Sequence, residues 1–227
     1  MEQLKTEALF LQGGSLAYSW LCKFEYPWEA LPHVADFIVK LGMELQEAAY
    51  SRVAEDIWIA KSARLASTAQ IKGPCIICEG AEVRQGAFIR GSALVGSGAV
   101  VGNSTELKNC ILFDGVQVPH YNYVGDSILG YRAHMGAGAI TSNVKGDRTP
   151  VTVQCGEVRV ETRLSKLGSM LGDYAEIGCN SVLNPGTVVG AHTNVYPLSS
   201  VRGYVPPDCI YKGNGVLMKK QGGEGRS

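Results

Sequence analysis

Residues 75–101 read CIICEGAEVRQGAFIRGSALVGSGAVV, and a large apolar residue recurs in this stretch at every sixth position. The same step extends in both directions, from Ile59 to Phe113, without interruption. From Leu65 to Phe113, the residue two places before the large one is small in eight of nine cases, Ile111 being the exception. A six-residue period fits neither an amphipathic helix nor an alternating strand. It predicts an all-β prism with flat sides of six residues, whose large residues point inside.

The repeat is interrupted in the second half of the chain. It is disturbed after Phe113 and returns in full only at Leu171, and residues 141–170 lack it. This segment is expected to form a loop outside the prism. Two valine-rich runs in it, residues 151–153 and 158–160, predict a small hairpin. Long loops that interrupt a rigid scaffold usually serve function.

Residues 1–52 do not follow the repeat. Helical spacing over residues 28–45, broken by Pro32 and Gly42, predicts one or two short helices. They are expected to cover the first coil, whose open edge would otherwise invite self-association. The predicted division of the chain is a helical extension, a β-helix with the loop insertion, and a frayed tail, over residues 1–52, 53–212 and 213–227.

Composition limits the classes of function. The 21 basic residues balance 21 acidic ones, which does not favour nucleic acid or an anionic membrane as a partner. No apolar run approaches a membrane span, no signal peptide is evident, and seven cysteines cannot all pair within one chain. A cytoplasmic protein with reduced thiols is therefore expected. Cys75 and Cys78 have the spacing of half a zinc site, but Cys75 occupies a small position of the repeat, so no metal site is predicted.

Two segments lead to a family resemblance, HYNYVGDS at residues 120–127 and MGAGAITSN at residues 135–143. Together with the hexads over residues 53–212, they resemble the acetyltransferase domain of sugar-1-phosphate nucleotidyltransferase/glucosamine-1-phosphate N-acetyltransferases. Residues 26–31 resemble the linker after the nucleotidyltransferase domain of archaeal-type members. The resemblance implies a single-stranded left-handed parallel β-helix and a homotrimer with active sites between neighbouring prisms. It also implies transfer of acetyl from acetyl-CoA to the amine of a hexosamine 1-phosphate.

The resemblance also implies roles for individual residues. His120 matches the general base, a task that suits an imidazole near neutral pH. Tyr123 matches a tyrosine that contacts the sugar phosphate, and Asn143 matches an asparagine that binds the amino sugar. Ala137 matches the residue whose backbone N–H faces the thioester carbonyl, where an oxyanion develops.

Arg90 and Lys108 match two residues of the family that contact the sugar phosphate. They are eighteen residues apart, which is one coil of three hexads, so they are expected to lie side by side on one outer face. Two neighbouring cations form a phosphate clamp, whereas the alternative is a pair of solvated charges. The match to the family motif favours the clamp.

Other positions match the family less closely. His134 stands where the family commonly has a second sugar-binding asparagine, and it could share proton transfer with His120. Either Lys145 or Arg148 could serve as the cation of the loop, and the sequence does not decide between them. Acetyl-CoA is expected along the later coils, near three residues: Cys179, Asn180 and Pro197. No metal is implied in the transfer step, although magnesium could accompany the phosphate.

The sequence also bears on three other classes of function. Residues 1–52 contain one pair of adjacent glycines, Gly13-Gly14, and no motif like Gly-x-Gly-Thr-Arg, so nucleotidyl transfer by this chain itself is not expected. The alternative is a non-catalytic trimer that senses a sugar phosphate and partners a separate nucleotidyltransferase. A carbonic-anhydrase-like β-helix would need three metal-binding histidines across coils, which the histidine positions do not provide. The sequence leaves open gluco or galacto configuration, and whether the acceptor carries a phosphate or a nucleotide.

Overall fold

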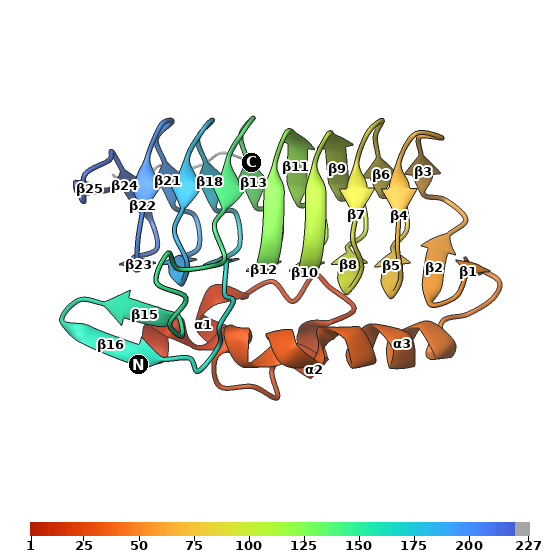
Figure 1. The fold of residues 1–227 in the computed structure, drawn as a ribbon, viewed down its shortest axis with the longest axis horizontal. Helices are drawn as coiled ribbons and strands as arrows, with labels where there is room; N and C mark the ends of the chain where they lie inside the picture. Colours follow the sequence, from red (N-terminus) through yellow and green to blue (C-terminus); the bar gives the residue numbers. More distant parts are fainter. Residues whose placement is uncertain (221–227) are drawn as a thin grey trace.

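The chain folds as a prism of stacked parallel strands with a layer of helices along one flank (Figure 1). The structure is a computed structural model that describes residues 1–220. One face of the prism is a nine-stranded sheet. The other two faces join in a 14-stranded sheet, because β10 (Glu106–Leu112) and β12 (Tyr123–Leu129) run through the corner between them. The predicted fold class, a left-handed single-stranded parallel β-helix with an N-terminal helical extension, is confirmed.

Each coil contributes one strand to each face, except that the last coil has none on the second face. The first face carries β3 (Arg64–Leu65), β6 (Glu82–Val83), β9 (Val100–Asn103), β11 (Gln117–His120), β13 (His134–Met135), β18 (Glu176–Ile177), β21 (Asn194–Val195), β24 (Cys209–Tyr211) and the antiparallel β25 (Leu217–Lys219). The second face carries β4 (Gln70–Ile71), β7 (Phe88–Ile89), the first halves of β10 and β12, β14 (Ile140–Thr141), β19 (Val182–Leu183) and β22 (Ser200–Val201). The third face carries β1 (Tyr50–Ala54), β2 (Ile57–Ala60), β5 (Cys75–Ile77), β8 (Ala93–Val95), the second halves of β10 and β12, β17 (Ser169–Leu171), β20 (Thr187–Val189) and β23 (Tyr204–Val205).

The six-residue step fails at one corner of the middle coils. Leu112, not Phe113, aligns with the inward residue Val95 of the preceding coil. The corner at Asn109 contains one residue fewer than the equivalent corner of the coil before it, because the pairing offset falls from eighteen residues to seventeen there. The prediction that Phe113 occupies an inward position is therefore wrong. Its ring packs instead against Phe10 of the N-terminal segment, with the centroids 4.8 Å apart.

The third face is apolar on its outside as well as its inside. The middle residue of each strand points away from the prism, opposite to its neighbours, yet six such residues are buried: Ile76, Leu94, Ile111, Ile128, Met170 and Val188. The N-terminal helices and the loop insertion cover them. Helix α3 (Val34–Glu44) contacts β5, β8 and β10, and the hairpin of β15 (Thr152–Cys155) and β16 (Val158–Glu161) contacts β20 and β23 (Figure 1).

The helical layer corrects two expectations. Besides α3 it comprises η1 (Glu2–Leu4), α1 (Thr6–Leu9), α2 (Tyr18–Leu21) and η2 (Pro27–His33). The layer lies along the third face, whereas β1 pairs with β2 at the open edge of the first coil, so the expectation that the helices cover this edge is wrong. Gly42 does not break the helix. Helix α3 continues through it, and a side chain there would meet the Trp58 ring, 2.4 Å from its Cβ position.

Truncation of an outward residue of the third face is expected to be costly. Leu94→Ala should lower the free energy of unfolding by about 2–5 kcal/mol, because it leaves a cavity under the helical layer. Gln117→Ala, at an exposed outward position of the first face, is the matched control and should change stability by less than about 0.5 kcal/mol. Urea denaturation measures both. If both variants lost an equally small amount of free energy of unfolding, the helices would not pack firmly on this face.

Candidate functional site

Four successive coils bring the predicted catalytic and acetyl-CoA residues to one edge of the prism, where the first face turns into the second. The N–H of Gly138 donates to the carbonyl of His120 (3.0 Å), and the N–H of Asn180 donates to the carbonyl of Ala137 (2.8 Å). One coil further, the N–H of Leu198 donates to the carbonyl of Cys179 (2.9 Å). This ladder, which we call the catalytic edge, aligns five residues predicted to act together: His120, Ala137, Cys179, Asn180 and Pro197.

His120 ends β11, and a buried asparagine fixes its backbone. The N–H of His120 donates to Oδ1 of Asn122 (3.1 Å), while Nδ2 of Asn122 donates to the carbonyls of Gly136 (2.8 Å) and Ala139 (3.0 Å). The imidazole itself is exposed. Sequence reasoning missed Asn122, although asparagine is a residue type whose side chain hydrogen-bonds to nearby backbone at turns.

Ala137 presents a free backbone donor at the edge. Within residues 1–220 its N–H has no hydrogen-bond acceptor, as an oxyanion donor requires. Gly136 permits the close stacking beneath it, because a Cβ there would lie 2.7 Å from the backbone nitrogen of Cys179. The edge can therefore present an N–H to a carbonyl oxygen close to the coil that carries His120.

The predicted sugar-binding residues meet on the second face. Nζ of Lys108 lies 2.9 Å and 3.0 Å from the carboxylate oxygens of Asp126. Asn143 donates to the same carboxylate and to the hydroxyl of Tyr123 (3.3 Å). Burial, together with the nearby carboxylates of Asp126 and Glu106, raises the pKa of Tyr123, so its hydroxyl stays protonated at neutral pH. Lys108, Tyr123 and Asn143 thus form one cluster, to which the structure adds Asp126.

Arg90 and Lys108 lie in the same register of adjacent coils, as the eighteen-residue spacing predicts. Each of them already has an anionic partner. Arg90 contacts Glu106 at 2.7 Å, and this hydrogen bond raises the pKa of the guanidinium. Lys108 contacts Asp126. The structure therefore shows two ion pairs rather than two unpaired cations, and sequence reasoning missed both carboxylates.

His134 lies apart from His120. It pairs in register with Gln117, three positions before His120 on β11, which corresponds to about 10 Å along a strand. Its Nδ1 lies 2.9 Å from Oε2 of Glu176. The structure does not bring the two histidines together within one chain, so it gives no support to shared proton transfer.

The two candidate loop cations are not part of the Asp126 cluster. Lys145 donates to the hydroxyl of Thr149 and lies 3.5 Å from Asp147. It lines a hollow together with Asn184 and Arg202 of later coils. Arg148 is exposed, with a φ of +58°. The choice between these two residues stays open.

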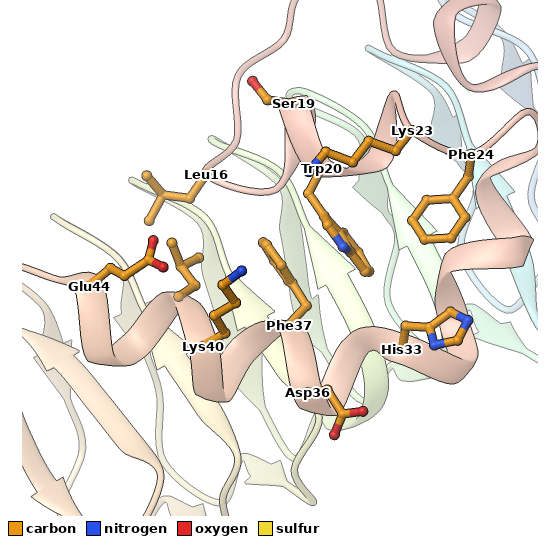
Figure 2. Close-up of a pocket in the computed structure, with 11 residues that line it drawn as sticks. Leu16, Ser19, Trp20, Lys23, Phe24, His33, Asp36, Phe37, Lys40 and Glu44 are labelled. Atoms are coloured by element: carbon orange, nitrogen blue, oxygen red, sulfur yellow. The ribbon is translucent and has the colours of Figure 1, made fainter.

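A larger hollow lies elsewhere, between α2 and α3 on the outside of the helical layer (Figure 2). It has a volume of about 680 Å³, and the Trp20 and Phe37 rings stack in it with centroids 4.1 Å apart. Its lining contains none of the predicted site residues. Within residues 1–220 no three His, Cys, Asp or Glu side chains lie close enough together to bind a metal ion.

Comparison with known proteins supports the resemblance. The family model of the GMPPB C-terminal domain matches residues 71–167. A bifunctional sugar-1-phosphate nucleotidylyltransferase/acetyltransferase of Sulfurisphaera tokodaii is 33% identical over 94 residues, which are 41% of this chain and 23% of the relative. The bifunctional protein GlmU of Methanocaldococcus jannaschii is 39% identical over 90 residues, 40% of this chain and 22% of that protein. The resemblance to the β-helix acetyltransferase domain of such enzymes is confirmed.

This acetyltransferase-like β-helix spans about a quarter of the length of the curated relatives it matches. Among solved structures, the acetyltransferase domain of PglB from Neisseria gonorrhoeae with acetyl coenzyme A is 17% identical with a TM-score of 0.32, over 68% of this chain and 53% of that one. Such values do not establish a shared site. Over residues 1–220 no helix has the length and apolarity that crossing a membrane would require.

Proposed function

We propose that this protein is an N-acetyltransferase that moves acetyl from acetyl-CoA to the amine of a hexosamine 1-phosphate. The observation that carries the proposal is the alignment at the catalytic edge of an exposed histidine, a free backbone N–H and two later coils, beside a polar cluster on the next face. Acetyl transfer needs a base, an oxyanion donor and a place for each substrate. The names of the relatives, which include nucleotidylyltransferase/acetyltransferase, support the reaction class.

The residues of the catalytic edge divide the chemistry. The neutral amine nitrogen of the acceptor forms a bond to the thioester carbonyl carbon, and His120 takes the proton from that nitrogen. The N–H of Ala137 stabilises the negative charge that develops on the carbonyl oxygen. The C–S bond then breaks with its electron pair going to sulfur, and the proton held by His120 neutralises the thiolate. Acetyl-CoA lies along the edge beside Cys179, Asn180 and Pro197.

The cluster on the second face binds the acceptor. Asn143 and Tyr123 contact the sugar, and Arg90 and Lys108 contact the phosphate. The Arg90–Glu106 pair is exposed, and such pairs contribute little to stability, so a phosphate dianion can replace Glu106 as the partner of Arg90. His134 lies on a different face, and in a homotrimer it can reach the cluster of a neighbouring prism. Seven free thiols suit the reducing cytoplasm as the site of the reaction.

Removal of the proposed base should strongly lower turnover without unfolding the prism. His120→Ala is expected to lower kcat by roughly 10²- to 10⁴-fold, while thermal unfolding stays unchanged because the imidazole is exposed. Thiol release from acetyl-CoA measures turnover with glucosamine 1-phosphate, galactosamine 1-phosphate, their 6-phosphates and UDP-hexosamines. His192→Ala, whose ring stacks on Tyr174 away from the edge, is the control. If the wild type released no thiol with any of these acceptors, the non-catalytic sensing trimer would be favoured.

The phosphate contact can be tested separately from the sugar contact. Arg90→Gln should raise KM for the sugar 1-phosphate at least about tenfold, since a charge-assisted hydrogen bond contributes roughly 1.5–3 kcal/mol, and should leave KM for the unphosphorylated amino sugar unchanged. Arg84→Gln is the matched control, because Arg84 forms a similar pair with Glu82 (2.9 Å) outside the cluster. An equal rise of KM for both acceptors would exclude a phosphate contact for Arg90.

Cysteine alkylation can report acetyl-CoA at the catalytic edge. Cys179 is exposed, whereas burial raises the pKa of Cys78 and of Cys110 to about 12. Iodoacetamide at pH 8 is therefore expected to label Cys179 and to spare the two buried thiols. Acetyl-CoA should slow the labelling of Cys179 and leave that of the half-buried Cys22, in the helical layer, unchanged. If acetyl-CoA slows both or neither, Cys179 is not beside the cofactor.

A further inference from the structure

Asp126 is a buried carboxylate on which three side chains from two other segments converge. Only 4% of the residue is exposed. Its carboxylate accepts hydrogen bonds from Lys108, from Nδ2 of Asn109 (2.9 Å) and from Nδ2 of Asn143. A carboxylate that is buried away from water requires hydrogen-bond donors or a cation as partners. Two of the three donors, Lys108 and Asn143, are proposed acceptor-binding residues, whereas the third is not.

The backbone around Asp126 also joins the loop insertion to the site. The N–H of Gly168, at the end of the insertion, donates to the carbonyl of Asp126 (2.8 Å). The N–H of Leu167 donates to the carbonyl of Asn143 (2.9 Å), at the start of the insertion. Both ends of the insertion are therefore bonded to Asp126, one through its carbonyl and the other through its carboxylate. This arrangement places Asn143 on the second face rather than out in the loop.

The corners at which these residues lie are the shortened ones. Asn109 and Asp126 both have a φ of +48°, a conformation that Asn and Asp adopt more readily than other side chains. The coils pair there with an offset of seventeen residues, against eighteen in the coil before. The shortening brings the side chain of Asp126 between Lys108 and Asn143. Lysine has a flexible four-carbon stem, so an ion pair with a buried carboxylate defines where its ammonium lies.

We propose that Asp126 is the positioning residue of the acceptor site, holding the Lys108 ammonium and the Asn143 amide in the geometry that binds the sugar phosphate. The inference rests on the proposed function. Asp126 acts through the other two residues, because its carboxylate is buried beneath them. The effect of losing the carboxylate must therefore depend on whether Asn143 is present.

A double-mutant cycle tests this dependence. Asp126→Asn retains the shape of the side chain, and should lower kcat/KM for the sugar 1-phosphate at least about tenfold, the loss expected when a charged hydrogen-bond acceptor is removed. KM for acetyl-CoA should stay within about twofold, because the catalytic edge does not contact Asp126. In the Asn143→Ala background, Asp126→Asn should lower kcat/KM for the sugar 1-phosphate much less, because the effects of substitutions within one hydrogen-bond network are not additive. Asn109→Gly is the matched control. It removes a donor to Asp126, suits a positive φ, and should leave kcat/KM within about threefold.

If the two substitutions lowered kcat/KM additively, or if Asp126→Asn raised KM for the sugar 1-phosphate and KM for acetyl-CoA equally, Asp126 would be merely structural. A second readout works without turnover, namely labelling of Lys108 by an amine-reactive acetylating reagent, quantified by mass spectrometry. Asp126→Asn should speed the labelling of Lys108 about tenfold, because the ammonium loses its charged partner, and should leave that of Lys61, on a remote corner, unchanged. Equal labelling of Lys108 in both proteins would overturn the inference. If the wild type acetylates no acceptor and Lys108 is nevertheless protected, the proposed function fails and the role of Asp126 in fixing Lys108 stands.

Discussion

Each coil of this prism must return to its starting face in register, because its backbone N–H and C=O groups are satisfied by the coils before and after it. This constraint makes residues seventeen or eighteen positions apart neighbours in space. It explains why chemistry-bearing residues far apart in the chain, such as His120 and Ala137, share one edge. It also explains why the candidate site needs no separate scaffold, since the same ladder that holds the fold together spaces the candidate site residues.

The same constraint creates a problem that the helical layer solves. A β-helix with one apolar outer face would expose a strip of large side chains along its whole length. Here the strip on the third face is buried under α3, the N-terminal segment and the β15–β16 hairpin. Asp173 links the N-terminal segment to the prism. Its carboxylate accepts hydrogen bonds from the backbone N–H of Gln12 (2.8 Å) in that segment and from the N–H of Tyr131 (2.8 Å) in the prism. The extension is thus part of the core of the protein rather than an end cap.

The periodic part of the molecule could be predicted from the sequence, whereas departures from the period could not. Inward positions such as Val95 and Val101 follow from counting in sixes. The shortened corner at Asn109 could not be predicted in this way. From Leu107, a five-residue step reaches Leu112 and a six-residue step reaches Phe113, and both are apolar. The sequence does contain a pattern that indicates the apolar strip on the third face. Ile76 and Leu94 are apolar residues at outward positions eighteen residues apart, and such a pattern predicts a covering layer.

Within the site, residue types could be predicted but the pairs they form could not. Arg90 and Lys108 lie in adjacent coils as expected, yet each cation has a carboxylate of its own. Glu106 and Asp126 are outward and corner residues, and nothing in the period distinguishes them from solvated charges. The pairing therefore depends on the corner geometry, which only the folded coil defines.

The two ion pairs differ in a way that bears on acceptor recognition. The four side chains carry no net charge, so a phosphate gains little from long-range attraction and must replace an existing partner. The exposed Arg90–Glu106 pair can exchange its carboxylate for a phosphate at small cost. The Lys108–Asp126 pair is largely buried, and breaking it would leave a charge without a partner in a dry site. Under the proposed function, Lys108 would contact the acceptor while still bound to Asp126, as a fixed hydrogen-bond donor, and Arg90 would supply the exchangeable charge. Under the same proposal, discrimination for a phosphate would depend mainly on how well it competes with Glu106, and discrimination for the sugar on the fixed donors around Asp126.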